Sequence, residues 1–454
     1  MLQSINPFSQ ETIKEYNEHS VNDINDIITK CNSAFLEWKH TTFKHRSELI
    51  LNVALLLRKN IINYSKLMTM EMGKPIKESR AEIEKCAWLC EYYAENGEGF
   101  LTQQIVKTDA SKSYVTFQPL GLILAVMPWN FPFWQVFRFA IPAIIAGNVV
   151  ILKHSSNVSG CALAIEQIIQ KAGFPKYFFK TLLIGSNKVA AVIENPLVKA
   201  VTLTGSIHAG KAVASKAGEM LKKTVLELGG CDPYIILKDA NLEQAAQTCA
   251  ISRLLNTGQS CIAAKRFIVV ESVLEEFQQL LIRNMENAQM GNPMDMDTTI
   301  GPMARIDLRN ELHEQVQRSI KLGAKLALGG HIHDKKGAFY PPTILTTVKP
   351  GMPAFDKELF GPVAAIISVK DEQEAIALAN NTIYGLGAAV FTKDIKRGEQ
   401  IAKYELEAGS CFVNDFVKSD PRLPFGGIKQ SGYGKELSKF GIREFVNIKT
   451  VYIK

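Results

Sequence analysis

The first hundred residues carry apolar side chains at intervals of three and four, as in Ile24, Ile27 and Ile28 and in the run 49–57. This spacing is the period of a helix with one buried face. The pattern predicts helices from residue 21 to about residue 98, which we expect to act as scaffold.

The pattern changes at Gly121 to short apolar runs separated by stretches long enough for a helix. These runs cover residues 121–127, 148–152, 180–184 and 198–203. Such alternation is typical of an open parallel sheet covered by crossover helices. Ligands of such sheets bind beyond the carboxyl ends of the strands.

A second unit of strands and helices follows Gly230 and begins with strands at 233–237 and 266–270. Two further segments, 113–117 and 446–453, alternate like strands but are isolated from both units. We expect them to form a projecting arm that pairs with a partner subunit. Simple edge strands would give the same pattern.

Composition narrows the class of protein. At 454 residues with 46% apolar side chains, the chain is long enough for two hydrophobic cores. A net charge of +7 without a dense basic run favours an anionic small molecule over nucleic acid or a membrane as partner. The absence of a leader pattern or spanning apolar run predicts a cytoplasmic protein. Eight cysteines without CxxC pairs suit a reducing compartment and predict neither disulfides nor a metal site.

Polar residues follow the ends of the predicted strands of the first sheet. Gly205 and Ser206 open a helix after the fourth strand, where free amides and the helix dipole favour a pyrophosphate. Lys153 follows a neighbouring strand and could add a cation to that site. Because there is no GxGxxG fingerprint, the Gly-Ser turn alone is more often only a helix cap, and Lys153 makes the nucleotide interpretation about as good.

The segment 256–261 reads Asn-Thr-Gly-Gln-Ser-Cys and follows Glu227 by about one strand and one helix. A thiol such as Cys261 and a carboxylate such as Glu227 are the parts that a cysteine nucleophile and its base require. A lone cysteine in such a turn is more often structural, so the assignment depends on the wider pattern. We expect Cys231, beside the glycine pair 229–230, to be a packing residue.

Six segments together resemble the aldehyde dehydrogenase superfamily, in its order and spacing and over essentially the whole chain. They are 128–130 (Pro-Trp-Asn), 204–206 (Thr-Gly-Ser), 227–230 (Glu-Leu-Gly-Gly), 258–261 (Gly-Gln-Ser-Cys), 358–362 (Glu-Leu-Phe-Gly-Pro) and 424–427 (Pro-Phe-Gly-Gly). Segments 127–138 and 419–424 look more closely like the short bacterial NAD(P)-dependent succinate-semialdehyde dehydrogenases.

The resemblance implies an α/β fold with three parts. These are a Rossmann-like cofactor-binding domain at 1–107 and 121–228, an α/β catalytic domain at 229–430, and a small β oligomerisation arm at 108–120 and 445–454. A homodimer or homotetramer is the expected assembly.

The resemblance also assigns the catalytic roles. Cys261 is the expected nucleophile toward an aldehyde, because the thiolate attacks carbonyl carbon. The Asn130 side-chain amide and the Cys261 backbone N–H are the expected oxyanion donors. After hydride transfer to nicotinamide, Glu227 is the expected base that activates water to hydrolyse the thioester.

Cofactor choice depends on the residue three positions after Lys153. NAD-preferring relatives have a glutamate there that binds the ribose hydroxyls, whereas this chain has Ser156. Without that carboxylate, a 2′-phosphate meets a hydroxyl and the Lys153 cation, which predicts NADP in preference to NAD. The remaining expected cofactor contacts are Trp129, Gly205, Ser206, Leu228, Glu358 on the nicotinamide-side ribose, and Phe360 near that ring.

Substrate choice depends on what binds the far end of the aldehyde. Arg138, eight residues after Asn130, is placed like the carboxylate-binding arginine of the semialdehyde enzymes, with Ser419 and Phe425 as its expected neighbours. A second arginine of those enzymes is replaced by Leu255. Asp415 would disfavour a dianionic substrate if it pointed inward, unless Lys418 offset its charge. Recognition of the substrate carboxylate is therefore expected to be weaker or broader than in the enzymes with two arginines.

Three readings remain open at this point. The first is oxidation of succinate semialdehyde, with glutarate semialdehyde, aliphatic and aromatic aldehydes as alternative substrates. The second is a cofactor-independent cysteine esterase or thioesterase, which leaves Lys153, Ser206 and Glu358 unexplained. The third is a binding protein without catalysis, which the complete set of Cys261, Glu227 and Asn130 argues against.

Overall fold

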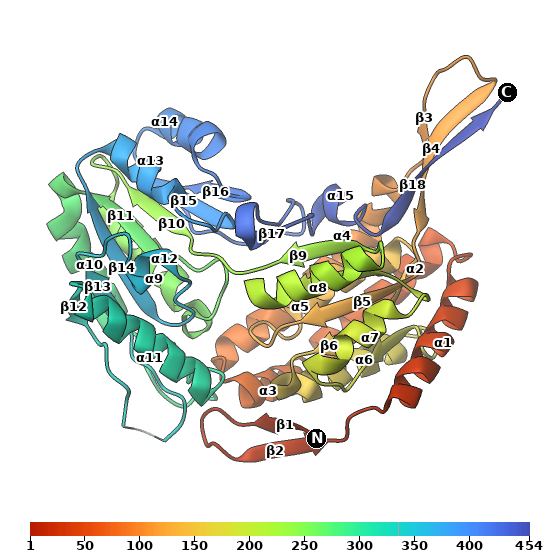
Figure 1. Ribbon diagram of the computed structural model, residues 1–454, viewed down its shortest axis with the longest axis horizontal. Coiled ribbons are helices and arrows are strands. Elements are labelled where there is room, and N and C mark those ends of the chain that lie inside the picture. Colours follow the sequence, from red (N-terminus) through yellow and green to blue (C-terminus); the bar gives the residue numbers. More distant parts are fainter. Residues whose placement is uncertain (335) are drawn as a thin grey trace.

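The computed structural model describes residues 1–334 and 336–454 and has the α/β fold expected from the sequence (Figure 1). Two large sheets lie side by side, each with helices packed on it, and a β ribbon projects from the unit that contains the N-terminus. No helix among the described residues is long and apolar enough to cross a membrane.

The N-terminal hundred residues confirm the helical prediction. Four helices follow one another: α1 (Val21–Trp38), α2 (Phe43–Lys59), α3 (Ile61–Met72) and α4 (Ile76–Phe100). A reciprocal capping box between Ser20 and Asp23 begins α1. The sequence did not reveal the antiparallel hairpin before α1, formed by β1 (Leu2–Ile5) and β2 (Thr12–Tyr16).

The first large sheet has the strand order β17-β9-β8-β5-β6-β7. Its strands are β5 (Leu122–Met127), β6 (Val149–His154), β7 (Phe179–Thr181), β8 (Val198–Thr204), β9 (Lys223–Glu227) and β17 (Gly432–Tyr433). All pairs are parallel except β17 on β9. The predicted parallel sheet is confirmed, although β7 ends at Thr181, before the predicted residue 184.

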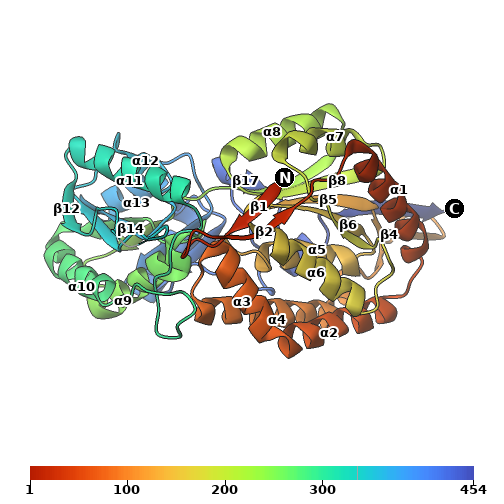
Figure 2. The same cartoon turned by 90° about the horizontal axis from the view of Figure 1, so that it is seen from below.

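Helices cover both faces of this sheet (Figure 2). Helices α7 (Val189–Glu194) and α8 (Ile207–Glu219) lie on one face, and α5 (Trp134–Ile145) and α6 (Ser159–Lys171) lie on the other. Helices α2 to α4 form a further layer outside α5 and α6. Every residue of α5 is buried, because this helix lies between the sheet and α4.

The second large sheet has the strand order β12-β13-β14-β11-β10-β15-β16, with only the edge strand β12 antiparallel to its neighbour. Its strands are β10 (Pro233–Ile236), β11 (Arg266–Val270), β12 (Lys325–Leu328), β13 (Thr343–Thr346), β14 (Val363–Val369), β15 (Gly387–Phe391) and β16 (Ser410–Val413). Its helices are α9 (Leu242–Leu254), α10 (Leu274–Glu286), α11 (Ile306–Lys321), α12 (Pro353–Asp356), α13 (Glu372–Asn380) and α14 (Ile395–Gln400). A separate hydrophobic cluster lies on each face.

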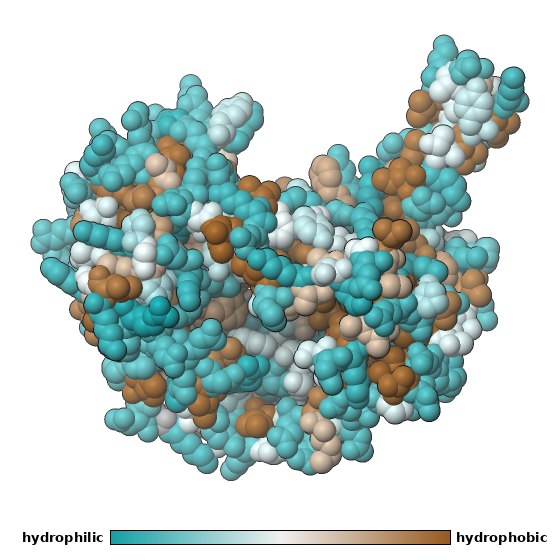
Figure 3. All heavy atoms as spheres, in the orientation of Figure 1, coloured by the Kyte–Doolittle hydropathy of each residue, from teal (hydrophilic) through white to brown (hydrophobic). Residues whose placement is uncertain are grey.

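The two isolated strands of the sequence pair with each other in the projecting ribbon. Strand β18 (Val446–Ile453), which follows the short helix α15 (Ser438–Gly441), runs antiparallel to β4 (Lys112–Pro119), and β3 (Gln104–Ile105) adds a third strand. Ile105, Ile448 and Ile453 are exposed on this ribbon, and Figure 3 shows apolar atoms along it. The ribbon therefore presents apolar side chains and open strand edges to its surroundings.

Candidate active site

Cys261 lies in the tight turn that links α9 to β11. Two residues of this turn, Asn256 and Thr257, are fully buried in the left-handed region, with φ of 54° and 55°. Gly258 also has positive φ, and a Cβ on it would lie 2.4 Å from the Gly361 backbone. Such strain persists only where surrounding contacts hold it, so the loop that presents Cys261 is fixed by its packing.

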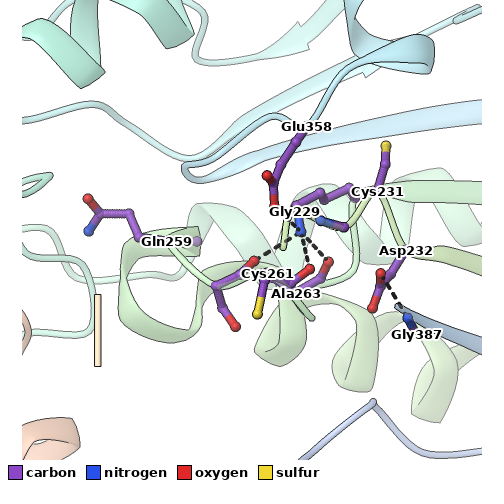
Figure 4. A network of polar contacts seen from close by, with 12 residues as sticks. Gly229, Cys231, Asp232, Gln259, Cys261, Ala263, Glu358 and Gly387 are labelled. Carbon is purple, nitrogen blue, oxygen red and sulfur yellow. Dashed lines mark hydrogen bonds and ion pairs between the residues drawn. The ribbon is translucent and has the colours of Figure 1, made fainter. Parts of the chain in front are cut away.

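A buried lysine fixes the backbone around the thiol. Lys265 Nζ donates to the carbonyl oxygens of Ser260 at 2.9 Å, of Cys261 at 2.7 Å and of Ala263 at 3.3 Å. The same ammonium lies 3.5 Å from the Glu358 carboxylate, and Figure 4 shows Cys261, Ala263 and Glu358 gathered at this point. Lys265 thus connects the nucleophile loop to a residue predicted to bind the cofactor.

Two cavities meet at Cys261. The larger, of about 760 Å³, is lined by Asn130 and by predicted cofactor contacts, namely Trp129, Gly205, Ser206, Leu228, Glu358 and Phe360. The smaller, of about 190 Å³, is lined by the predicted substrate contacts Arg138, Ser419 and Phe425. The thiol therefore has a large site on one side and a small site on the other.

Aromatic and acidic residues shape the larger cavity. Trp129 and Phe360 approach edge to face, with ring centroids 5.7 Å apart. The Glu358 carboxylate accepts the Gly230 N–H at 3.1 Å. Lys153 and Ser156 lie at the carboxyl edge of β6 and its continuation, one strand away from the cavity, and burial lowers the pKa of Lys153. These features suit a dinucleotide that crosses the carboxyl edge of the sheet.

The prediction of a free Gly205 amide is wrong. The Gly205 N–H donates to the Glu227 carbonyl oxygen at 2.9 Å, because β8 and β9 remain paired up to that point. Ser206 is the N-cap of α8 and accepts the Ala209 N–H, as the cap interpretation expected. The anion-binding capacity of this turn comes instead from the first N–H groups of α8, which have no partner inside the helix.

Asn130 lies at the junction with its amide directed at the nucleophile loop. Its Nδ2 donates to the Gln259 carbonyl oxygen at 3.1 Å, and Asn256 donates to the Asn130 carbonyl oxygen at 2.7 Å. An amide nitrogen carries two hydrogens, so one remains for an oxyanion beside Cys261. The side chain is 4% exposed and is therefore held for this task.

Glu227 is buried at the end of β9, beside the segment that carries Glu436. Burial raises the pKa of Glu227 to about 8, with the neighbouring Glu436 carboxylate as the second cause. Neither carboxylate oxygen has a hydrogen-bond partner among the described residues. Gly426 has a φ of 150°, and a Cβ there would lie 2.7 Å from Glu227 Oε1. A carboxylate whose pKa is raised in this way suits a base that takes up a proton near neutral pH.

Burial also controls the charge of the nucleophile. It raises the pKa of the Cys261 thiol to about 12, although Arg138 and Lys265 act in the opposite direction. The thiol is therefore protonated at neutral pH, and its attack on a carbonyl requires a base. Glu227 is close enough to Cys261 to affect the pKa of the thiol.

The smaller cavity receives side chains from several separate elements. Arg138, on α5, forms an ion pair with Glu436, and its guanidinium lies 4.5 Å from the Phe425 ring centroid. Leu255, which stands where the resemblance implied a second arginine, also lines the cavity. Asp415 pairs with Lys418 at 2.6 Å, so its charge is offset as the sequence had allowed.

Sequence reasoning missed three charged residues of this site. Lys265 and Glu436 fall outside the segments that carried the resemblance, and Lys85 lies on a helix that was interpreted as scaffold. An unpaired lysine on the buried side of an amphipathic helix is a weak sequence signal. Only the fold shows that Lys85 reaches the cavity beside Cys261.

The chain belongs to the aldehyde dehydrogenase family, whose model matches residues 1–451. A probable NADP(+) succinate-semialdehyde dehydrogenase of Synechocystis sp. is 47% identical over 452 residues, covering 100% of this chain and 99% of the relative. The Escherichia coli NAD(P)+ succinate semialdehyde dehydrogenase Sad is 44% identical, covering 99% of this chain and 97% of that one.

Comparison with solved structures supports the same family and fold. The succinic semialdehyde dehydrogenase of Streptococcus pyogenes in complex with NADP+ superposes with a TM-score of 0.97 at 36% identity, covering 100% of both chains. The family and fold inferred from the six segments are therefore confirmed.

Proposed function

We propose that this protein oxidises succinate semialdehyde to succinate, with NADP+ preferred over NAD+. The observation that carries the proposal is the position of Cys261 at the junction of a large cavity and a small one. The names of relatives at 44% and 47% identity support the same reaction. A cofactor-independent hydrolase would leave the larger cavity without a purpose.

The residues at the junction perform the covalent chemistry. Glu227 accepts the Cys261 proton, and the thiolate forms a C–S bond to the aldehyde carbon while Asn130 and the Cys261 N–H bind the resulting oxyanion. The nicotinamide, when bound, supplies the acceptor for the hydride that leaves this carbon. After hydride transfer, Glu227 releases the cysteine proton to solvent and is again a base. It then takes a proton from the water that attacks the thioester carbon, and passes this proton to the departing Cys261 thiolate as the carboxylate product leaves.

The larger cavity fits the nicotinamide half of the cofactor. Trp129 and Phe360 form the wall of this cavity, and Glu358 faces it from the loop before β14. The first amides of α8 suit the pyrophosphate. Lys153 and Ser156 take the 2′-phosphate, because a cation and a hydroxyl replace the carboxylate that would repel it.

The smaller cavity takes the aldehyde, with its distal carboxylate among Arg138, Ser419 and Phe425. A volume of about 190 Å³ suits a short aliphatic chain. We assign the protein to the cytoplasm, where thiols stay reduced, and infer a homodimer or homotetramer assembled through the β ribbon.

The test is nicotinamide reduction by the purified protein with succinate semialdehyde, run with NADP+ and with NAD+. We expect faster turnover with NADP+ and no turnover in Cys261→Ala. Cys411→Ala, which changes a cysteine that lines neither cavity, should retain activity. Reduction with simple aldehydes alone would contradict the substrate. Cys261-dependent ester hydrolysis without any reduction would contradict the dehydrogenase reaction.

A further inference from the structure

A second cation enters the smaller cavity from α4. Lys85 Nζ donates to Ser419 Oγ at 2.9 Å and lies 4.2 Å from the centroid of the Trp134 ring. Lys85, Ser419 and Trp134 all line the cavity that contains Cys261. The ammonium is thus partly buried and held between a hydroxyl and an aromatic face, which orients it without neutralising it.

Most of the other charges around this cavity are compensated by ion pairs. Glu78 is not, but it accepts the Asn256 N–H at 2.7 Å, and burial raises its pKa to about 7. Arg138 pairs with Glu436, and Asp420 pairs with Arg422 at 2.6 Å. Glu82 pairs with Lys74 and accepts two further backbone N–H groups, those of Phe133 and Trp134, each at 2.9 Å.

Lys85 is the cation of this cavity that is left without an ion pair in the described part of the chain. No carboxylate lies within ion-pair distance of its ammonium among residues 1–334 and 336–454. Burial lowers the pKa of Lys85 to about 8, and the Arg138 charge acts in the same direction. A cation without a counter-ion in a confined site is unfavourable until an anion enters.

We propose that Lys85 binds the distal carboxylate of the semialdehyde and supplies the second positive charge that Leu255 does not. This inference rests on the proposed function. Arg138 contributes a guanidinium already neutralised by Glu436, so the net charge that selects an anionic aldehyde comes from Lys85. Ser419, held by the Lys85 ammonium, is positioned to bond the same carboxylate.

A purely structural role for Lys85 makes a different prediction. If the lysine only tied the loop of Ser419 to α4, its loss would affect every aldehyde alike. If it binds the carboxylate, its loss affects charged substrates alone. The contact is made in both the ground state and the transition state, so the effect should fall mainly on KM rather than on kcat.

The experiment compares Lys85→Met, Lys85→Arg and the control Lys77→Met, which alters an exposed lysine of the same helix. Kinetics are measured with succinate semialdehyde and with butanal, which has the same number of carbons and no carboxylate. We expect Lys85→Met to lower kcat/KM for succinate semialdehyde roughly ten- to a hundredfold, mainly through KM, with little change for butanal. Lys85→Arg should recover part of the loss, and Lys77→Met should behave as the wild type.

Equal losses on both aldehydes, or no loss on either, would overturn the assignment. A wild type that does not prefer succinate semialdehyde over butanal would overturn the proposed substrate as well. If the wild-type preference stands and Lys85→Met keeps it, only the Lys85 inference fails.

A measurement on the wild type alone covers the case in which Lys85→Met does not fold. The ratio of kcat/KM for the two aldehydes should fall as pH rises above about 8, because the ammonium loses its charge. The charged and titratable groups around Lys85 are Glu78, Glu82 and Cys86 on α4, Arg138 on α5, and Lys418 and Asp420 on the loop after β16. Burial raises the pKa of Glu78 to about 7, so the decisive part of the range lies above pH 8, where Glu78 is already ionised. Titration of Glu227 affects both aldehydes and cancels in the ratio. A ratio that stays constant from pH 7 to pH 10 would contradict the proposal.

Discussion

The two cavities at Cys261 are built in different ways. The larger is lined by contiguous segments at the ends of strands, such as the turn 128–130 after β5 and the turn 204–206 after β8. The smaller is lined by spaced side chains of α4 and α5, together with residues 260–262 of the nucleophile turn and 416–419 of the loop after β16. Cofactor binding is thus encoded in short segments, whereas substrate selection depends on how distant elements pack.

The largest expected effect comes from Glu227, the proposed base near Cys261. Glu227→Gln should lower kcat by about 10²- to 10⁴-fold with either aldehyde and either cofactor, because proton transfer is lost. The pKa of Glu227 is about 8, so its basic form increases as pH rises and wild-type activity should rise up to that pH. Steady-state rates between pH 6 and pH 9 test this rise in activity, which should be absent from Glu227→Gln.

The second largest loss of activity is expected from Asn130, the proposed oxyanion donor. Asn130→Ala removes a donor that acts on the developing charge, with an expected loss of about 10²- to 10³-fold in kcat. Because Asn130 acts at the junction, the loss should be equal for succinate semialdehyde and butanal, as steady-state kinetics would show. A loss confined to the charged aldehyde would mean that Asn130 belongs to the smaller cavity.

A change restricted to the larger cavity should have a smaller effect. Ser156→Glu places a carboxylate near the 2′-phosphate, and like-charge repulsion should lower kcat/KM for NADP+ about ten- to a hundredfold relative to NAD+. Ser155→Glu is the matched control, since it adds the same charge one position earlier. The preference for succinate semialdehyde over butanal should not change in either variant. A change would show that the two cavities do not act independently.

The same division explains what the sequence could predict. Cys261, Glu227 and Asn130 lie in segments whose residue types and order indicate their chemistry, and the strands of both sheets follow from local apolar runs. The hydrogen bond of the Gly205 amide could not be predicted, because it depends on the pairing of β8 with β9. Lys85 and Glu436 could not be predicted either, because their partners lie more than 290 residues away in the chain, as with Ser419 and Arg138.

The high pKa of the half-buried Cys261 thiol has a further consequence for the lifetime of the enzyme. Peroxides and alkylating reagents react with thiolates far faster than with thiols. With its pKa near 12, Cys261 spends almost all of its resting time in the form that resists them. The burial that makes the nucleophile dependent on a base therefore also protects it from irreversible damage between turnovers.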